Sequence, residues 1–280
     1  METENAILEG AISVAAALRS GSRPIHFIAI REGKNDPNIR RLEQDAQRIG
    51  IPFKRTTEEA LDAYVTGKTH GGVIASVGER RFAPLEDLIS SGDKRGWCVM
   101  IDGVEDPFNF AASIRSLYAA GASGLVVRPR NWMSAAGIVA RASAGASELI
   151  PTAIAETAED AANAFKAAGY LIACAGDGPG SRPLYENDLT RPLFLLIGGE
   201  KRGVTRSFQD RADMQLEIPY ARATAHSLGT AAAAAIFAFE ILRQRGYQTT
   251  ARTTHPGPSG HPSRSGKGKT PPAPHRGSRP

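Results

Sequence analysis

The stretch that most constrains the fold is residues 193–205, which read LFLLIGGEKRGVT. Its first five residues are large and apolar, and a continuous apolar run is typical of a strand covered on both faces in a parallel sheet. Gly198-Gly199 then permits a tight turn and lets the backbone approach a ligand closely. An acid and two bases follow at residues 200–202. The stretch therefore predicts a buried strand that ends in a ligand-binding loop.

The residues around this stretch alternate between short apolar runs and helical patterns. We expect strands at residues 97–101, 124–127, 170–175, 193–197 and 214–218, and helices at residues 109–120, 157–168 and 227–245. Such alternation indicates an α/β fold with a mainly parallel sheet flanked by helices. Ligands of such sheets bind at the carboxyl ends of strands, so a site is expected in the loops that follow the strands.

The first 90 residues have the pattern of a smaller α/β unit. Apolar residues recur at helical spacing from Leu8 to Leu18, and this pattern stops at Gly21. We expect further helices at residues 37–49 and 57–64 and strands at residues 25–30 and 73–77. The polar residues 90–96 predict a domain boundary. The expected division is a small α/β domain at 1–90, a linker at 91–96, a larger domain at 97–247 and a tail at 248–280.

The basic character of the chain is concentrated in this tail. Residues 248–280 hold six of the 34 Lys and Arg residues and no acid, so the first 247 residues carry 28 bases against 29 acids. The tail has seven prolines, five glycines and no Leu, Ile, Val or aromatic residue, so we expect it to be disordered. It is either an electrostatic arm for polyanions such as RNA or a solubilising extension.

Composition excludes several classes of protein. An apolar content of 41% and a charged content of 22% are typical of a globular chain, and no apolar run has the length of a membrane span. The first ten residues carry acids where a secretory signal is basic, so a cytoplasmic location is expected. Cys98 and Cys174 lie in apolar runs, which predicts two buried thiols rather than a disulfide scaffold or a zinc site. We expect no bound metal.

Two glycine-rich segments imitate nucleotide-binding loops. Residues 176–180, GDGPG, lack the spacing of the dinucleotide fingerprint, and Pro179 would obstruct the helix that should follow, so a tight turn is favoured. Residues 198–205 have the outline of a phosphate loop, but Val204 occupies the position of the lysine that would reach the β- and γ-phosphates. This substitution argues against ATP or GTP hydrolysis, which we keep as a third alternative.

Two further segments each leave a strand and enter a helix. Residues 102–115, DGVEDPFNFAASIR, contain Asn109 as a candidate helix cap and place Arg115 about two turns into the helix. Residues 218–230 end one strand and start the last helix, with Ser227 as a candidate N-cap. Helix N-termini offer free N–H groups to anions, but each segment taken alone also fits a plain capped helix.

Taken together, three segments resemble the signature motifs of the SpoU (TrmH) family of RNA ribose 2′-O-methyltransferases, in the knotted SPOUT superfamily. The motifs resemble residues 106–115, residues 195–203, and Ile218-Pro219 followed by Ser227-Leu228 and an Ala-rich helix. Residues 142–146 also resemble the family pattern, and the resemblance covers about residues 97–245. Residues 5–90, including His70-Gly71-Gly72, resemble the ribosomal-protein-like substrate-binding domain of the members that modify ribosomal RNA.

The resemblance implies methylation of a ribose 2′-hydroxyl in structured RNA, with S-adenosylmethionine as methyl donor and ribosomal RNA favoured over transfer RNA. It implies a C-terminal trefoil knot, a homodimer with each active site near the subunit interface, and no membrane partner. The implied catalytic residues are Asn109, Arg115, Glu200 and Ser227. The implied cofactor contacts are Ala175, Gly198, Ile218 and Leu228.

The roles of these residues follow from the chemistry of methyl transfer to a hydroxyl. The family mechanism proposes the arginine at position 115 as a base, whereas a guanidinium is effectively always protonated. We therefore prefer that Arg115 clamps an RNA phosphate and stabilises the emerging alkoxide. Asn109 would orient Arg115 or the ribose, and Glu200 would hold the loop or Arg115.

The sequence departs from the family motifs at two positions. Gly229 stands where the family usually has Asn, and Ala111 stands where it usually has Gly. The first departure removes a side chain that could form a hydrogen bond near the cofactor or the ribose. The alternative function, from a different class, is therefore an RNA-binding or ribosome-assembly protein that retains the fold with weak or no catalysis.

Overall fold

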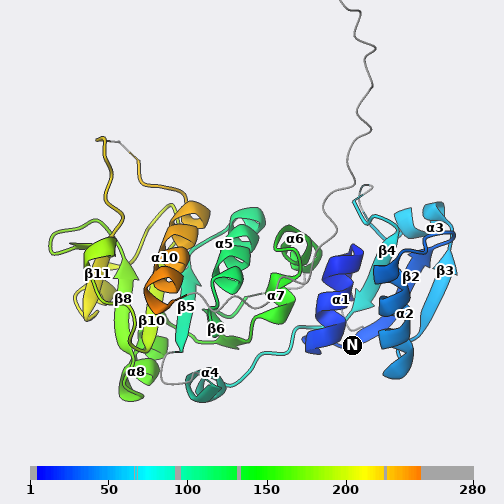
Figure 1. Ribbon diagram of the computed structural model, residues 1–280, viewed down its shortest axis with the longest axis horizontal. Coiled ribbons are helices and arrows are strands. Elements are labelled where there is room, and N and C mark those ends of the chain that lie inside the picture. Colours follow the sequence, from blue (N-terminus) through cyan, green and yellow to red (C-terminus); the bar gives the residue numbers. More distant parts are fainter. Residues whose placement is uncertain are drawn as a thin grey trace, which may run out of the picture. The chain divides into compact units, whose positions relative to one another are not determined.

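The computed structural model describes residues 5–65, 67, 69–91, 96–130, 134–223 and 226–246. The tail at 248–280 lies outside the described residues, as does most of the linker expected at 91–96. The strands of the described residues form one sheet of seven strands and one of four (Figure 1).

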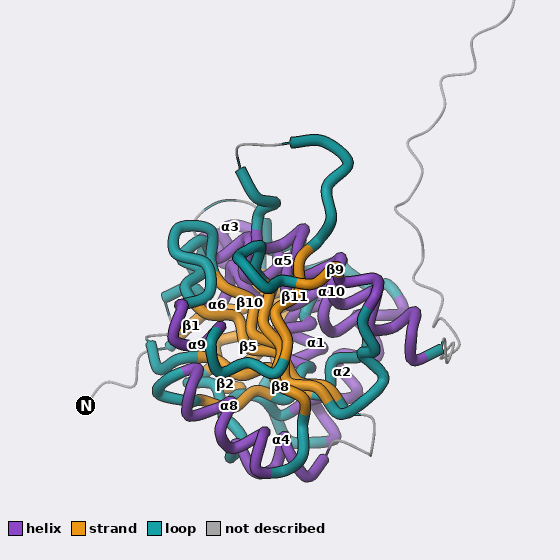
Figure 2. The backbone as a smooth tube through the Cα atoms, turned by 90° about the vertical axis from the view of Figure 1, so that its left-hand side faces the viewer, coloured by secondary structure: helices purple, strands orange, loops and turns teal. Residues whose placement is uncertain are grey.

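The larger sheet has the order β7-β6-β5-β10-β8-β11-β9, and every pair of neighbouring strands in it is parallel. Its strands are β5 (Trp97–Asp102), β6 (Gly124–Val127), β7 (Thr152–Ile154), β8 (Leu171–Ala175), β9 (Arg182–Pro183), β10 (Leu193–Gly198) and β11 (Met214–Glu217). Figure 2 shows β5, β8, β10 and β11 close together, as their pairing requires. The parallel α/β sheet expected from the sequence is confirmed.

Helices cover the larger sheet on both faces, which explains why β10 is apolar throughout. Leu195 and Ile197 of β10 pack in one core with α5 (Pro107–Ala119) and α10 (Thr230–Arg245). Phe194 and Leu196 point to the other core, which contains residues of α4 (Leu85–Ser91), α8 (Ala158–Ala167) and α9 (Arg206–Gln209). A strand with an apolar core on each side has no solvent-facing positions, so its sequence does not alternate.

The smaller sheet has the order β1-β4-β2-β3, with β2 and β3 parallel and the other pairs antiparallel. Its strands are β1 (Ala6–Glu9), β2 (Ile25–Arg31), β3 (Phe53–Thr56) and β4 (Val73–Val77). Residues of α1 (Ala11–Ser20) and α2 (Pro37–Arg48) share one core with it, and Leu61 of α3 (Glu58–Asp62) packs in a second cluster. The small N-terminal α/β unit is therefore present.

The expectation that the first helix includes Leu8 is wrong. Leu8 lies in β1 and pairs with Ala75 of β4, and the helix begins after Gly10, whose φ of 86° interrupts a helix. The residues of β1 alternate between buried and half-buried, which is a strand pattern four residues long. A helical repeat that continued across Gly10 concealed this short strand.

The N-terminal unit packs against two short helices from the second half of the chain, its sheet against the first and α1 against the second. These are α6 (Ala136–Ala142) and α7 (Ala146–Leu149). Ala136 and Ala140 of α6 belong to the same core as Leu8 and Val14. A Cβ atom added at Gly145, just before α7, would lie 2.7 Å from the Cβ of Ala16 in α1. The N-terminal unit and the larger domain therefore contact each other here so closely that only small residues fit between α1 and α7.

The described residues agree with the expected cysteine chemistry. Cys98 and Cys174 are free and buried, and burial raises the pKa of the Cys98 thiol to about 12 and that of Cys174 to about 11. Both thiols are therefore protonated and unreactive at neutral pH. Among the described residues, no helix is long and apolar enough to cross a membrane, and no cluster of His, Cys, Asp and Glu could hold a metal ion.

Gly145 and Gly169 form a matched pair for testing the contact between α1 and α7. Both have a left-handed backbone, with φ near 80° and 85°, but a Cβ at Gly169 would meet nothing within 4 Å. Gly169→Ala should lower the free energy of unfolding by about 1–2 kcal/mol through backbone strain. Gly145→Ala should cost about 1–3 kcal/mol more, because the added methyl group overlaps α1. Equal losses in urea unfolding would contradict this contact.

Candidate functional site

The loops at the carboxyl ends of three neighbouring strands line one cleft of about 500 Å³. They are residues 175–177 after β8, residues 197–204 at the end of β10, and residues 216–220 at the end of β11. The first residues of α10 and the loop before it close the cleft. Because β10 lies between β5 and β8, while β6 and β7 follow β5 outward, the strand order reverses here, which is where open α/β sheets bind ligands.

The glycines of the 198–203 loop are required by close packing of backbone on backbone. A Cβ at Gly198 would lie 2.2 Å from the carbonyl carbon of Gly203, and one at Gly199 would lie 2.1 Å from the carbonyl oxygen of Gly103. The Gly203 N–H donates to the Gly199 carbonyl over 2.8 Å, so the loop folds back on itself. The glycines therefore let this loop fold tightly against neighbouring backbone at the wall of the cleft.

One carboxylate oxygen connects the three motifs. Glu200 Oε1 accepts a hydrogen bond of 3.1 Å from Asn109 Nδ2 on α5. The same atom accepts one of 3.3 Å from the backbone N–H of Thr230, the first residue of α10. The expectation that Asn109 caps α5 is wrong: Asp106 is the N-cap, and its carboxylate accepts a hydrogen bond of 2.7 Å from the backbone N–H of Asn109. Glu200 thus joins the loop after β10 to the N-termini of two helices.

Glu200 supplies the cap that α10 lacks in its own sequence. The N-cap residue of α10 is Gly229, which has no side chain to accept a bond from the first turn. The expectation that Ser227 caps this helix is wrong, because the helix begins three residues later and Ser227 is exposed in the preceding loop. A Cβ at Gly229 would lie 3.1 Å from Glu200 Oε1, so a larger residue there would compete with the carboxylate for this space.

The cleft brings together most of the residues expected at the site. Ala175, Gly198, Glu200, Ile218, Ser227 and Leu228 all line it. Ile218 is half-buried and Leu228 is exposed, so both have apolar surface available to a ligand. Asn109 reaches the cleft through its bond to Glu200. These residues therefore lie at one cleft, and the role of each residue stays a prediction.

Arg115 does not line the cleft. It lies six residues beyond Asn109 on α5, which is about 9 Å along the helix axis, and its side chain is exposed. Within this chain it is therefore separated from the loop that contains Gly198. If Arg115 takes part in the reaction, the substrate or a second copy of the chain must bring the two together.

Tyr220 is a cleft residue to which the sequence analysis gave no role. Its hydroxyl accepts a hydrogen bond of 2.9 Å from the backbone N–H of Leu228, so it connects the loop after β11 to the loop before α10. Thr230 acts similarly, because its hydroxyl donates to the Gly198 carbonyl over 3.4 Å. Tyr220 follows Ile218-Pro219 directly, and this position next to a family motif is the feature of the sequence that could have identified it.

Charged side chains border the mouth of the cleft. Lys201 Nζ lies 2.6 Å from the Glu105 carboxylate, and this hydrogen bond, followed by the charge of the lysine, lowers the pKa of Glu105. Both side chains are largely exposed, so water screens the pair and it contributes little to stability. Lys201 and Arg202 remain available at the rim to attract a polyanion.

The link through Glu200 can be tested by three variants. Glu200→Ala should lower the free energy of unfolding by about 1 kcal/mol, because α10 loses its cap. It should also weaken binding of S-adenosylmethionine in calorimetry, because the loop loses its hydrogen bonds to Asn109 and to the Thr230 N–H. Glu200→Gln keeps an acceptor oxygen and should bind normally, as should the rim control Glu105→Ala. Equal affinity in Glu200→Ala and the control would refute the link.

Comparisons with known proteins identify the family of this chain. Residues 96–239 match the SpoU rRNA Methylase family, and residues 7–83 match the RNA 2'-O ribose methyltransferase substrate binding family. A Xanthomonas campestris pv. campestris protein named 23S rRNA (guanosine-2'-O-)-methyltransferase RlmB is 30% identical over 88% of this chain and 99% of its own length. The protein of the same name from Pseudomonas syringae pv. tomato is 29% identical over 84% of this chain and 94% of its own length.

Solved structures give the same result for the fold. A rRNA methyltransferase from Sinorhizobium meliloti with AdoMet bound superposes with a TM-score of 0.72 at 26% identity, covering 86% of this chain and 88% of that one. The SpoU methyltransferase AviRb from Streptomyces viridochromogenes has a TM-score of 0.71 at 24% identity, covering 86% and 90%, which supports the fold alone. The match to the family across the larger domain, together with a relative aligned over its whole length, shows that this chain belongs to the SpoU rRNA methylase family.

Proposed function

We propose that this chain transfers a methyl group from S-adenosylmethionine to the ribose 2′-hydroxyl of a guanosine in 23S ribosomal RNA. The observation that carries the proposal is the convergence of the three family motifs on one cleft through Glu200. The relatives named for this activity align with this chain over almost their full length, including the N-terminal domain. Because that substrate is ribosomal RNA, the proposed location is the cytoplasm.

The cleft fits S-adenosylmethionine in size and in the chemistry of its walls. Its volume of about 500 Å³ lies in the range of small-molecule sites. Backbone groups at Gly198 and Ala175 are suited to the polar edge of an adenine ring, and Ile218 and Leu228 can pack on its faces. When bound, S-adenosylmethionine supplies an already activated methyl group. The protein therefore has to position the ribose oxygen and assist the loss of one proton.

The residues on α5 are proposed to handle the ribose. Arg115 is exposed and its guanidinium group presents a planar set of N–H donors, so it can clamp the adjacent RNA phosphate and stabilise the developing alkoxide. Asn109 and Glu200 hold each other by a hydrogen bond and orient the start of α5 toward the cleft. Ser227 lies in the cleft wall and can donate a hydrogen bond to either substrate.

A homodimer would resolve the separation of Arg115 from the cleft. Phe108, Ala112 and Arg115 form an exposed stripe on α5 at helical spacing, with 54% of Phe108 exposed. Phe239 of α10 is also 50% exposed. Large exposed apolar side chains are typical of association surfaces. We propose that two copies of the chain pair through α5 and α10 and that each site forms near this interface.

We also propose that the chain has the trefoil knot that the family resemblance implies.

The proposal is tested by mapping ribose methylation across total RNA from cells with and without this protein. One guanosine of 23S rRNA should lose its methyl group when the protein is absent and regain it when the wild-type chain is restored. Arg115→Ala should not restore it, although calorimetry should show S-adenosylmethionine affinity close to that of wild type. An unchanged methylation map, or wild-type turnover by Arg115→Ala, would contradict the proposed substrate or the proposed role of Arg115.

The dimer is tested by light scattering on purified protein. Introducing a charge into the apolar contact by Phe108→Asp or Phe239→Asp should convert the dimer to a monomer. The matched control is Phe53→Asp, because Phe53 is 41% exposed but lies on β3 of the N-terminal sheet. The control should keep the wild-type mass. A monomeric wild-type protein, or three variants that all remain dimeric, would refute this interface.

A further inference from the structure

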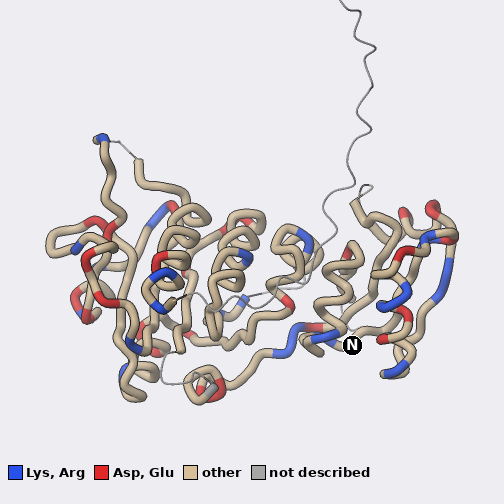
Figure 3. Tube along the Cα trace, in the orientation of Figure 1, with Lys and Arg blue, Asp and Glu red and all other residues tan. Residues whose placement is uncertain are grey.

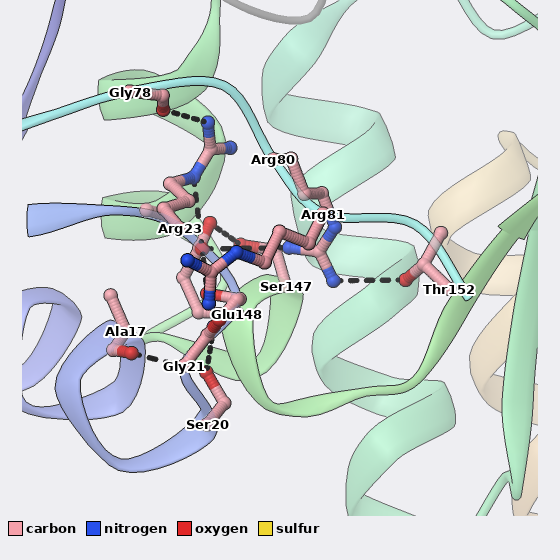
Figure 4. Close-up of polar contacts among 12 residues, drawn as sticks. Ala17, Ser20, Gly21, Arg23, Gly78, Arg80, Arg81, Ser147, Glu148 and Thr152 are labelled. Carbon is pink, nitrogen blue, oxygen red and sulfur yellow. Dashed lines mark hydrogen bonds and ion pairs between the residues drawn. The ribbon is translucent and has the colours of Figure 1, made fainter.

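A buried cluster of charges lies where the segments before β2 and after β4 contact α7, outside the proposed site. We name it the junction cluster; it consists of Ser22, Arg23, Arg80, Glu148 and Thr152. Glu148 is on α7, and its carboxylate accepts hydrogen bonds of 2.6 Å from Ser22 Oγ and 3.0 Å from Arg23 Nε. Arg80 Nη1 lies 3.5 Å from the same carboxylate. Figure 4 shows Arg23 and Arg80 reaching Glu148 from two different segments of the chain.

The junction cluster joins the two halves of the chain. Ser22 and Arg23 precede β2, and Arg80 lies in the segment between β4 and α4, where Figure 3 shows Lys and Arg positions in blue. Glu148 and Thr152 belong to the second half. Arg80 Nη2 donates to the Ile150 carbonyl over 3.1 Å and to Thr152 Oγ1 over 3.0 Å, so one guanidinium contacts three residues across the junction.

The charges of the junction cluster are almost completely removed from water. The side chains of Glu148, Arg23 and Arg80 are 1%, 4% and 8% exposed. Burial alone would raise the pKa of Glu148, but Arg23, Arg80 and the Ser22 hydrogen bond together lower it, so the carboxylate is ionised at neutral pH. Removing one partner of such a group leaves a buried charge unpaired, so the cluster favours one arrangement of the two halves.

A second attachment lies on α6. Arg141 Nη1 is 2.7 Å from the Glu9 carboxylate of β1, and Thr69 donates to the same carboxylate over 2.6 Å. This pair is less buried than the junction cluster, with Arg141 31% and Glu9 13% exposed. The N-terminal unit is therefore attached both to α6 and to α7. With two attachments, it cannot rotate about either one of them.

The helices that carry these attachments also contact the helix of the proposed site. Phe110 and Ile114 of α5 line a cavity of about 30 Å³ together with Arg23, Arg80 and Glu148. Phe110 follows Asn109 directly, and Ile114 precedes Arg115. The buried side of α5 therefore lies against the junction, and its other side carries the two residues proposed to act on the ribose.

We propose that Glu148 is a positioning residue: it fixes the RNA-binding N-terminal domain to α5, so that the bound RNA presents one particular ribose to Asn109 and Arg115. The inference rests on the proposed function, because it assumes that the N-terminal domain holds the RNA substrate. It assigns the choice of nucleotide partly to a residue that touches neither RNA nor cofactor.

The test compares the full-length wild type with Glu148→Gln, which keeps the shape of the side chain and removes its charge. Small-angle X-ray scattering should show an increased radius of gyration for the variant, because the N-terminal sheet is released. Methylation at the target nucleotide should fall on the order of tenfold, with new methylation at neighbouring riboses, as expected for a misplaced reacting group. The affinity for S-adenosylmethionine in calorimetry should stay close to that of wild type.

A matched control separates positioning from a general loss of stability. Glu240 of α10 is also buried, with a side chain 5% exposed, and is paired with Arg243 over 2.8 Å away from the junction. Glu240→Gln should lower the melting temperature without changing the methylated nucleotide or the scattering. If Glu148→Gln does not fold, Arg141→Ala at the second attachment is measured in the same way and should shift both readouts in the same direction.

The outcomes distinguish failure of this inference from failure of the proposed function. Unchanged scattering and an unchanged methylation map in folded Glu148→Gln, or in Arg141→Ala where the first variant does not fold, would overturn the inference. A map changed to the same extent by Glu240→Gln would also overturn it. If the wild type methylated no RNA, the proposed function would fail, and the scattering would still decide whether Glu148 holds the two halves together.

Discussion

The proposed site depends on one hydrogen-bond acceptor, the Oε1 atom of Glu200. It accepts hydrogen bonds from the Asn109 side-chain amide on α5 and from the Thr230 N–H of α10. Glu200 itself is part of the loop that follows β10. The Thr230 hydroxyl also bonds to the Gly198 carbonyl and joins α10 to β10 directly, whereas the Asn109 side chain of α5 bonds to the loop through Glu200. Gly229 makes the arrangement possible, because the absence of a side chain leaves the end of α10 open to the carboxylate.

The parallel sheet is what brings these segments within reach of one another. β10 enters between β5 and β8, so the loops that follow these strands emerge side by side at one edge. Helices on both faces exclude water from β10 and leave the edge of the sheet as the place where polar groups can meet a ligand. Helix α5 is packed both on the sheet and against α6 and α7, which fixes the position of its N-terminus beside the site.

Much of the larger domain could be predicted because its signals are local. A buried parallel strand such as β10 has an apolar run of its own length, and the loops after such strands were the expected location of the site. Short or polar elements gave no such signal: β3, with the sequence FKRT, is an exposed edge strand, and β1 was hidden in a helical repeat. The N-cap of α10 was assigned to Ser227 because the actual cap comes from Glu200, 30 residues away in sequence. The pairing of Glu148 with Arg23 spans 125 residues and leaves no local pattern at all.

Two carboxylates thus act on α5 in different physical environments. Glu200 is exposed, so water competes for its bonds to Asn109 and Thr230, and the cleft can adjust when a ligand enters. Glu148 is buried between two guanidinium groups, where any rearrangement would leave a charge without a partner. The contacts on the cofactor side can adapt, which suits a small methyl donor that must enter and leave. The contacts on the side of the N-terminal domain are rigid, which suits a large RNA that must be held in one register. Helix α5 is the element on which both requirements meet.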